Sequence, residues 1–109
     1  MKLIVCVVTD KDTGPLLEEL TGKGYRATKL ASTGGFLKKG STTLLIGVEE
    51  SGVDEVLSII TRVCRSRQQM VTPISSLPGP AEYYVPYPLE VTVGGATVFV
   101  VDVEKSLKV

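Results

Sequence analysis

The alternation of apolar and polar residues along the chain predicts strands and helices in a regular order. The first run, residues 2–9 (KLIVCVVT), is apolar at nearly every position and rich in β-branched residues, which is typical of a strand buried on both faces. Residues 25–32 (YRATKLAS) and 41–48 (STTLLIGV) predict two further strands, antiparallel to each other across a glycine-rich turn. Successive side chains of residues 25–32 are expected to face opposite sides of the sheet.

Two amphipathic helices are expected beside these strands. The first follows residue 10, with Asp10 or Asp12 as its N-cap, and ends at the glycines of residues 22–24. The second is expected to begin at residues 51–52 and to bury one apolar face. That face is formed by Val53, Val56, Leu57, Ile60 and Val63. The last turn of the second helix is expected to hold the cations Arg62, Arg65 and Arg67, which suit a helix C-terminus.

The C-terminal part of the chain is expected to hold a short strand, a loop and a long strand. Residues 70–74 are the candidate short strand. The prolines of residues 75–88 prevent regular strand pairing, so this segment is expected to be a loop. Residues 89–103 (LEVTVGGATVFVVDV) predict one long final strand, in which the pair at residues 94–95 indicates a bulge or a close backbone approach.

The predicted order of strand, helix, strand, strand, helix and strand is that of the ferredoxin-like α+β fold. Both helices should then cover one face of an antiparallel sheet. The opposite face would be open, although the strands carry apolar residues on both faces. An exposed apolar face of that size is unusual for a monomer. We therefore expect this face to pack against other copies of the chain in an assembly with closed cyclic symmetry.

Size, composition and charge indicate one globular domain, residues 1–109. Hydrophobic residues make up 43% of the chain and charged residues 22%, which is an ordinary globular composition. Lys and Arg together number 12, as do Asp and Glu, and this zero net charge argues against a general binder of nucleic acid polymers. Because we find no signal peptide and no apolar run near the roughly 18 residues of a membrane span, we expect a cytoplasmic protein that does not enter a membrane.

The residue types present disfavour catalysis and metal binding. Histidine is absent, which removes the commonest general base, the commonest transition-metal ligand and every nucleophile triad built on histidine. Cys6 and Cys64 belong to no metal-ligand spacing, and Cys6 is expected to lie in the core. The acidic residues gather where helices are expected to begin, and capping explains them. We therefore expect no catalytic residue, no metal and no cofactor.

The turn at residues 34–40 (GGFLKKG), between two threonine-rich strands, is the candidate binding site. Glycine backbone permits close approach of a ligand, Arg26 suits a phosphate, and Phe36 can stack on a nucleobase. The same residues also fit a plain hairpin with solvated lysines at its tip and a phenylalanine in the core. No P-loop or dinucleotide fingerprint is present. The residues by themselves leave both interpretations open.

Three segments of the chain match a known pattern: residues 1–12 (MKLIVCVVTDKD), 26–48 (RATKLASTGGFLKKGSTTLLIGV) and 85–100 (VPYPLEVTVGGATVFV). They resemble the cyclic di-AMP receptor proteins of Gram-positive bacteria, which are PII-like signal-transduction proteins, and the resemblance covers nearly the full chain. It implies a PII-like homotrimer that binds cyclic di-AMP at each subunit interface and has no enzymatic activity. The signal would pass to an unidentified protein partner by loop rearrangement. The resemblance also implies a short T-loop at about 33–41 and a B-loop at about 66–88.

The same resemblance implies which residues contact the ligand. Arg26 corresponds to an arginine on the phosphate side, and Ala27 and Thr28 to a strand edge that contacts adenine and ribose. The turn that lines the base pocket corresponds to Gly35, Phe36 and Leu37. Gly47 corresponds to a backbone contact from the third strand, although the residues alone fit a strand glycine at a bulge equally well.

Two departures from the family pattern keep other ligands in view. Ser41 stands where the family usually has asparagine, and a hydroxyl makes fewer contacts to an adenine edge than an amide does. The C-terminal tail, with Lys108, differs from the family's tail, in which a glutamine reaches a neighbouring subunit's ligand. Each lost polar contact costs about 1 kcal/mol or more, so affinity is expected to fall about tenfold or beyond. The alternatives are a PII-like sensor of another adenine nucleotide and a protein-interaction module without a nucleotide.

Overall fold

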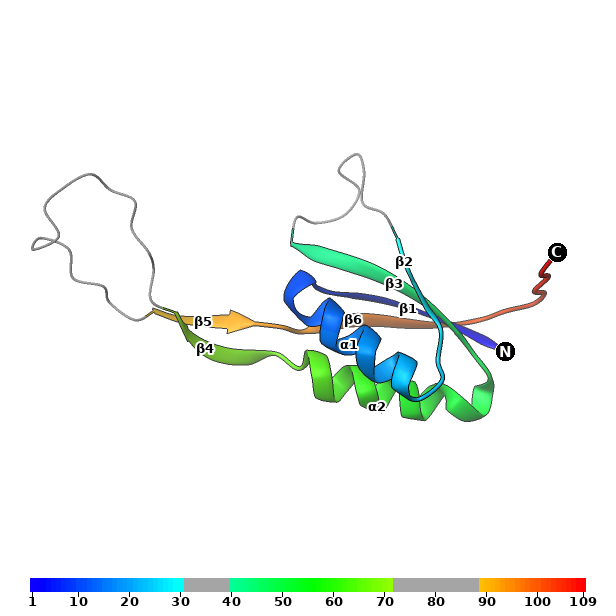
Figure 1. The fold of residues 1–109 in the computed structure, drawn as a ribbon, viewed down its shortest axis with the longest axis horizontal. Helices are drawn as coiled ribbons and strands as arrows, with labels where there is room; N and C mark the ends of the chain where they lie inside the picture. The colour runs from blue at the N-terminus through cyan, green and yellow to red at the C-terminus, as the bar shows by residue number, and fades with distance from the viewer. Residues whose placement is uncertain (31–39, 72–88) are drawn as a thin grey trace, which may run out of the picture.

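Two helices cover one face of a four-stranded antiparallel sheet in the computed structural model, which describes residues 1–30, 40–71 and 89–109 (Figure 1). The sheet has the order β2-β3-β1-β6, formed by β1 (Lys2–Thr9), β2 (Ala27–Lys29), β3 (Ser41–Val48) and β6 (Ala96–Asp102). Helix α1 (Asp10–Gly22) connects β1 to β2, and α2 (Val53–Cys64) follows β3 after a short 3-10 turn, Glu50–Gly52. The expected ferredoxin-like α+β arrangement is confirmed.

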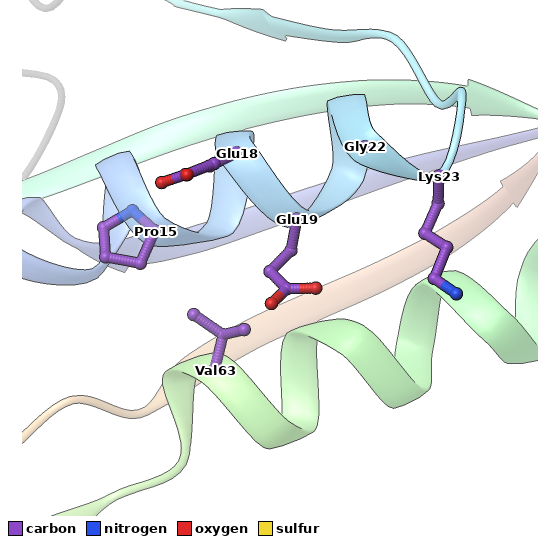
Figure 2. A pocket seen from close by; sticks show the side chains of 6 residues that line it. All are labelled: Pro15, Glu18, Glu19, Gly22, Lys23 and Val63. Atoms are coloured by element: carbon purple, nitrogen blue, oxygen red, sulfur yellow. The ribbon is translucent and has the colours of Figure 1, made fainter.

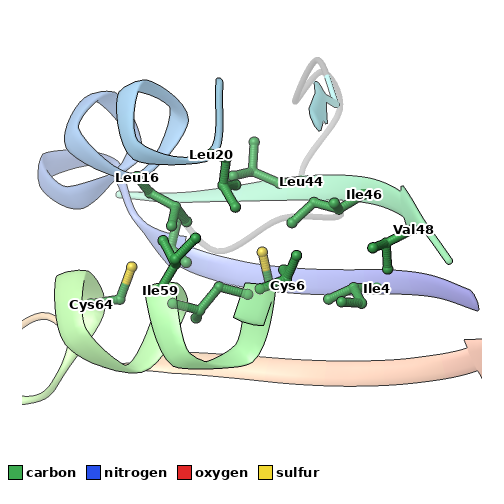
Figure 3. Close-up of a cluster of buried hydrophobic side chains, with 12 residues drawn as sticks. Ile4, Cys6, Leu16, Leu20, Leu44, Ile46, Val48, Ile59 and Cys64 are labelled. Carbon is green, nitrogen blue, oxygen red and sulfur yellow. The ribbon is translucent and has the colours of Figure 1, made fainter. Parts of the chain in front are cut away.

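The central strand β1 organises the core. It pairs along its full length with β3, from Lys2 opposite Val48 to Thr9 opposite Ser41, and pairs with β6 on its other side. Alternate residues of β1 point toward the helices because successive strand side chains face opposite sides of a sheet. The buried cluster in Figure 3 consists of Ile4, Cys6, Val8, Leu16, Leu20, Leu44, Ile46, Val48, Val56, Ile59, Ile60 and Cys64. The expected core position of Cys6 is therefore confirmed. Burial of a large aliphatic side chain of this kind contributes about 1.5–3 kcal/mol.

The start of α1 differs from the expectation that an aspartate caps it. The helix begins at Asp10, directly after β1, and its N-cap is Thr9, which makes no side-chain cap hydrogen bond. The carboxylate of Asp12 instead accepts hydrogen bonds from the Thr9 hydroxyl, at 3.1 Å, and from the guanidinium of Arg67. Tertiary ion pairing, and not capping, therefore accounts for Asp12.

A separate two-stranded sheet, which we call the arm, projects away from the four-stranded sheet (Figure 1). It consists of β4 (Arg67–Val71) paired antiparallel with β5 (Leu89–Val93). The short strand therefore begins three residues earlier than expected, at Arg67, which does not belong to the last turn of α2. The final segment is two strands and not one, because Gly94 and Gly95, with φ of 82° and 90°, separate β5 from β6. Left-handed backbone of this kind cannot continue a strand.

Strand β2 begins two residues later than expected, and residues 31–32 of the expected strand lie outside the described residues. Its bounds are Ala27–Lys29, and the ladder continues by one hydrogen bond, from the Leu30 N–H to the Thr43 carbonyl at 2.9 Å. The glycine turn of residues 34–40 falls outside the described residues, except for Gly40. The proposed T-loop and B-loop boundaries stay predictions, although Ser41 belongs to β3.

The sheet face opposite the helices carries apolar residues, as expected. The strand registers place Leu45, Val5 and Phe99 in one row across this open face, with Leu3 and Val101 in the next. Phe99 is 57% exposed and Val101 47% exposed. Residues of β1 on this face are only half-buried, so β1 is fully covered on its helical side alone.

Candidate functional site

A cleft at one end of the β2–β3 edge contains two of the residues singled out by sequence. Arg26 and Gly47 both line it, and its volume is about 410 Å³. The remaining lining residues are Met1, Gly24, Tyr25, Val48, Glu49, Ser51 and Gly52. The sequence thus predicted Arg26 and Gly47 as site residues but did not indicate the other residues that line this cleft.

The pairing of β2 with β3 brings Arg26 and Gly47 together. Ala27 lies opposite Ile46 and Thr28 opposite Leu45, so the chain just before β2 runs beside Gly47. These registers put Ala27 on the helix-covered face and Thr28 on the open face, because residues directly opposite each other share a face. The described members of the predicted site therefore follow one sheet edge, but their side chains do not all point the same way.

Gly47 lies in regular strand pairing and not at a bulge. The β1–β3 register runs without interruption through Leu3 opposite Gly47, so the bulge interpretation is wrong. A Cβ added at Gly47 would lie 3.2 Å from the terminal methyl of Met1, which is the far end of a flexible side chain. Gly47 is exposed. Its backbone edge is therefore open toward the cleft, where a larger side chain would occupy space beside Arg26.

Tyr25 positions the start of β2, a role that no local sequence pattern indicates. Its hydroxyl donates a hydrogen bond to the Glu55 carboxylate at 2.9 Å, and this bond raises the pKa of Tyr25. The ring packs over Gly52, where a Cβ would meet Val48 at 2.8 Å and the Tyr25 ring at 3.2 Å. Because Tyr25 precedes Arg26 directly, these contacts also position Arg26 at the cleft.

The charge of Arg26 is available to an anion. Arg26 is exposed, and within residues 1–30, 40–71 and 89–109 it takes part in no ion pair. The nearby carboxylate of Glu49 lies 3.9 Å from the N-terminal amine of Met1. A guanidinium beside an open backbone edge suits a phosphate or carboxylate, which it can bind through two parallel hydrogen bonds.

Ser41 lies at the opposite end of β3 from Gly47. It pairs with Thr9, and six steps of about 3.4 Å along the strand lead from it to Gly47, so the two residues are about 20 Å apart. A single ligand that contacts both residues of one copy must therefore extend along the β2–β3 edge. The other three predicted contacts, Gly35, Phe36 and Leu37, lie outside the described residues.

The two threonines after Ser41 have different environments. The Thr42 hydroxyl donates to the Asp10 carboxylate at 2.5 Å. The Thr43 hydroxyl is buried and has no hydrogen-bond partner in the described part of the chain. A buried hydroxyl without a partner costs about 1–3 kcal/mol.

A groove between the two helices contains none of the predicted site residues. Its lining residues are Pro15, Glu18, Glu19, Gly22, Lys23 and Val63, and Glu19 and Lys23 point into the gap between α1 and α2 (Figure 2). Glu19 forms an ion pair at 3.2 Å with Arg62, which lowers the pKa of Glu19. Arg62 thus lies in the last turn of α2, as expected, but its partner is α1.

The described residues contain neither a metal-binding cluster nor a membrane-spanning helix. The described part of the chain has no group of three or more histidine, cysteine or carboxylate residues placed to hold a metal ion. None of its helices has the length and apolar character needed to cross a membrane. Burial raises the pKa of both free thiols, Cys6 and Cys64, to about 11.

The fold is a small ferredoxin-like α+β domain, and its cleft combines an exposed arginine, Arg26, with an exposed strand glycine, Gly47. The sequence profile of the family described as "Cyclic-di-AMP receptor" matches residues 1–109. The chain therefore belongs to the cyclic-di-AMP receptor family. The crystal structure of a functionally unknown protein from Pediococcus pentosaceus is similar to this chain, with a TM-score of 0.78 and 41% sequence identity, over 99% of this chain and 96% of that chain.

Proposed function

We propose that this chain is a non-enzymatic, PII-like receptor that binds cyclic di-AMP along the β2–β3 edge. Three copies would assemble in the cytoplasm, with one ligand at each subunit interface, and loop rearrangement would pass the signal to a protein partner. The observation that carries this proposal is the cleft shared by Arg26 and Gly47 in a chain whose full length matches the receptor family.

The site chemistry fits a cyclic dinucleotide in three ways. The exposed Arg26 supplies a bidentate donor for a phosphate. The open backbone at Gly47 permits a flat base to approach closely. Ala27, Thr28 and Ser41 lie along the same edge, and the turn residues Gly35, Phe36 and Leu37 follow between β2 and β3 in sequence. A cyclic dinucleotide has two bases and two phosphates, which suits a site extended along the edge.

Isothermal titration calorimetry with cyclic di-AMP tests the proposal, with cyclic di-GMP and ATP as controls. Binding of cyclic di-AMP at one site per subunit, without heat from the controls, is the expected result. Binding of ATP alone would replace the proposal with the second candidate, a sensor of another adenine nucleotide, which Ser41 favours. No heat from any nucleotide would leave a protein-interaction module as the function.

Arg26→Ala tests the phosphate contact directly. A hydrogen bond to a charged group contributes about 1.5–3 kcal/mol, so cyclic di-AMP affinity should fall by about ten- to 150-fold. Arg62→Ala is the matched control, because the Glu19–Arg62 pair lies on the helical side of the sheet. The Arg62→Ala variant should bind cyclic di-AMP with the same affinity as the wild type. Equal affinities of the two variants would remove Arg26 from the site.

The proposed trimer is supported by the open apolar face, whose central row contains Val5, Leu45 and Phe99. Thr28 continues this row into the candidate site, so a copy packed on the face would also border the ligand. Light scattering should give three times the chain mass of 11.6 kDa. Phe99→Glu should dissociate the assembly, whereas Phe99→Leu should keep it. A wild-type mass of one chain would contradict the trimer.

A further inference from the structure

The first turn of α1 contacts the beginning of β3, where the candidate ligand residue Ser41 lies. The Asp10 N–H donates to the Gly40 carbonyl at 2.9 Å, and the Asp10 carboxylate accepts from the Thr42 hydroxyl at 2.5 Å. Asp10 therefore holds the residues on both sides of Ser41. A ligand that moves Ser41 must also act on Asp10.

The same helical turn contacts the arm through its next two residues. The Asp12 carboxylate binds the Arg67 guanidinium at both nitrogens, with distances of 2.8 and 3.3 Å. The Lys11 ammonium donates to the Gln69 side-chain carbonyl at 2.5 Å. Both partners belong to β4. One turn of helix thus joins the start of β3 to the base of the arm.

The Asp12–Arg67 pair lies inside the bend that connects the arm to the sheet. A Cβ at Gly94 would lie 2.5 Å from Arg67 Nη1, 2.6 Å from the Arg65 carbonyl oxygen and 3.1 Å from the Asp12 carboxylate. The side chain of Asp12 is 5% exposed and that of Arg67 36% exposed. Loss of the pair would leave a buried carboxylate without its cation, so the pair favours one position of the arm strongly.

We infer that the turn Asp10–Lys11–Asp12 couples the start of β3 to the arm, so that ligand contact at Ser41 changes how firmly the arm is held. The ligand part of this inference rests on the proposed function. The three residues are consecutive in the first turn of α1, so their backbone belongs to one helical unit. Because β4 and β5 pair only with each other among the described strands, the contacts at the arm's base control its position.

Hydrogen exchange of the arm in the ligand-free protein tests the coupling without any nucleotide. Exchange of backbone amides reports the opening of local structure. Asp12→Asn should speed exchange in residues 67–71 and 89–93 by about tenfold or more, and Arg67→Gln should do the same from the arm side. Arm exchange equal to that of the wild type in both folded variants would overturn the inference.

Thr42→Val tests the other end of the turn. It removes the hydrogen bond to Asp10 without a large change in shape, and it should also speed exchange in the arm. Thr43→Val is the matched control, because the Thr43 hydroxyl has no partner in the described ranges. In the Asp12→Asn background, Thr42→Val should add little. Two results would overturn the coupling. One is an exchange rate of the arm that Thr42→Val leaves unchanged, and the other is a double variant in which the rate increases of Thr42→Val and Asp12→Asn multiply as independent effects.

The last experiment adds saturating cyclic di-AMP. The wild-type arm should change its exchange on binding, and Asp12→Asn should bind with similar affinity but lose that change. Binding without any change in the wild-type arm would overturn the inference and keep the proposed function. Absence of binding would refute the proposed function alone, since the ligand-free variants decide the coupling independently.

Discussion

Replacement of Gly94 by alanine tests whether the bend between β5 and β6 requires glycine. Gly94 has a φ of 82°, and its missing Cβ leaves space for the Arg67 guanidinium and the Arg65 carbonyl. Left-handed backbone costs a residue with a Cβ about 1–2 kcal/mol. The clash with the Arg65 carbonyl involves backbone on both sides, so it cannot be relieved by rotation of a side chain.

Gly94→Ala is therefore expected to lower the free energy of unfolding by about 2–4 kcal/mol. This sum includes the strain of a left-handed alanine and the displacement of Arg67. For a domain of this size, this corresponds to a fall in Tm of about 10–25 °C. Gly14→Ala is the matched control, because Gly14 lies within α1 and nothing is within 4 Å of its added Cβ. That change should stabilise the protein by about 0.5–1 kcal/mol.

Urea unfolding followed by circular dichroism, at one fixed protein concentration, measures both variants. A lower free energy of unfolding for Gly94→Ala and a higher one for Gly14→Ala would support the requirement for glycine at the bend. A stability of Gly94→Ala equal to that of the wild type would refute it, because the strain and the clash would then be absent.

Two further predictions concern titratable groups. The hydrogen bond from the Arg67 guanidinium lowers the pKa of Asp12, so the pair stabilises the protein fully above the usual aspartate pKa of about 3.9 and loses this effect as pH falls through the lower folded value. Urea unfolding below about pH 4 should therefore show a smaller loss of stability for Asp12→Asn than for the wild type, and parallel losses would contradict the role of the pair. Burial raises the pKa of Cys6 and Cys64 to about 11, so a thiol reagent at pH 8 should modify neither until urea is added, and rapid modification of the native protein would contradict their core position.

The main elements of the fold could be predicted because their signals are local. The apolar runs of residues 2–9 and 41–48 gave β1 and β3 with their bounds, and the repeat of apolar residues gave α2. The close backbone approach expected at Gly94–Gly95 is confirmed, but the division of residues 89–103 into two strands could not be predicted, since the residues on both sides of the pair have the same apolar pattern. The left-handed backbone that separates β5 from β6 lies against Arg67, and Arg67 pairs with Asp12, which is distant in sequence.

The candidate site shows a similar limit. Arg26 and Gly47 could be chosen from their residue types and from the family pattern, and the β2–β3 register explains why they meet. Tyr25 and Gly52 could not be chosen, because their contact joins β2 to the start of α2 and leaves no local pattern. The distance between Gly47 and Ser41 also follows from strand register, which residue identity alone does not reveal.

The two ends of the arm lie side by side, and this has a consequence for how the protein can change. The Gly95 N–H donates to the Cys64 carbonyl at 2.5 Å, so the chain leaves the domain and returns to it at almost the same point. A segment attached in this way can be shortened, lengthened or exchanged while the strand order of the four-stranded sheet is kept. The chain between Cys64 and Gly95 is therefore a site at which insertions are tolerated. Proteins that evolve from one receptor can differ there in the segment that recognises a partner.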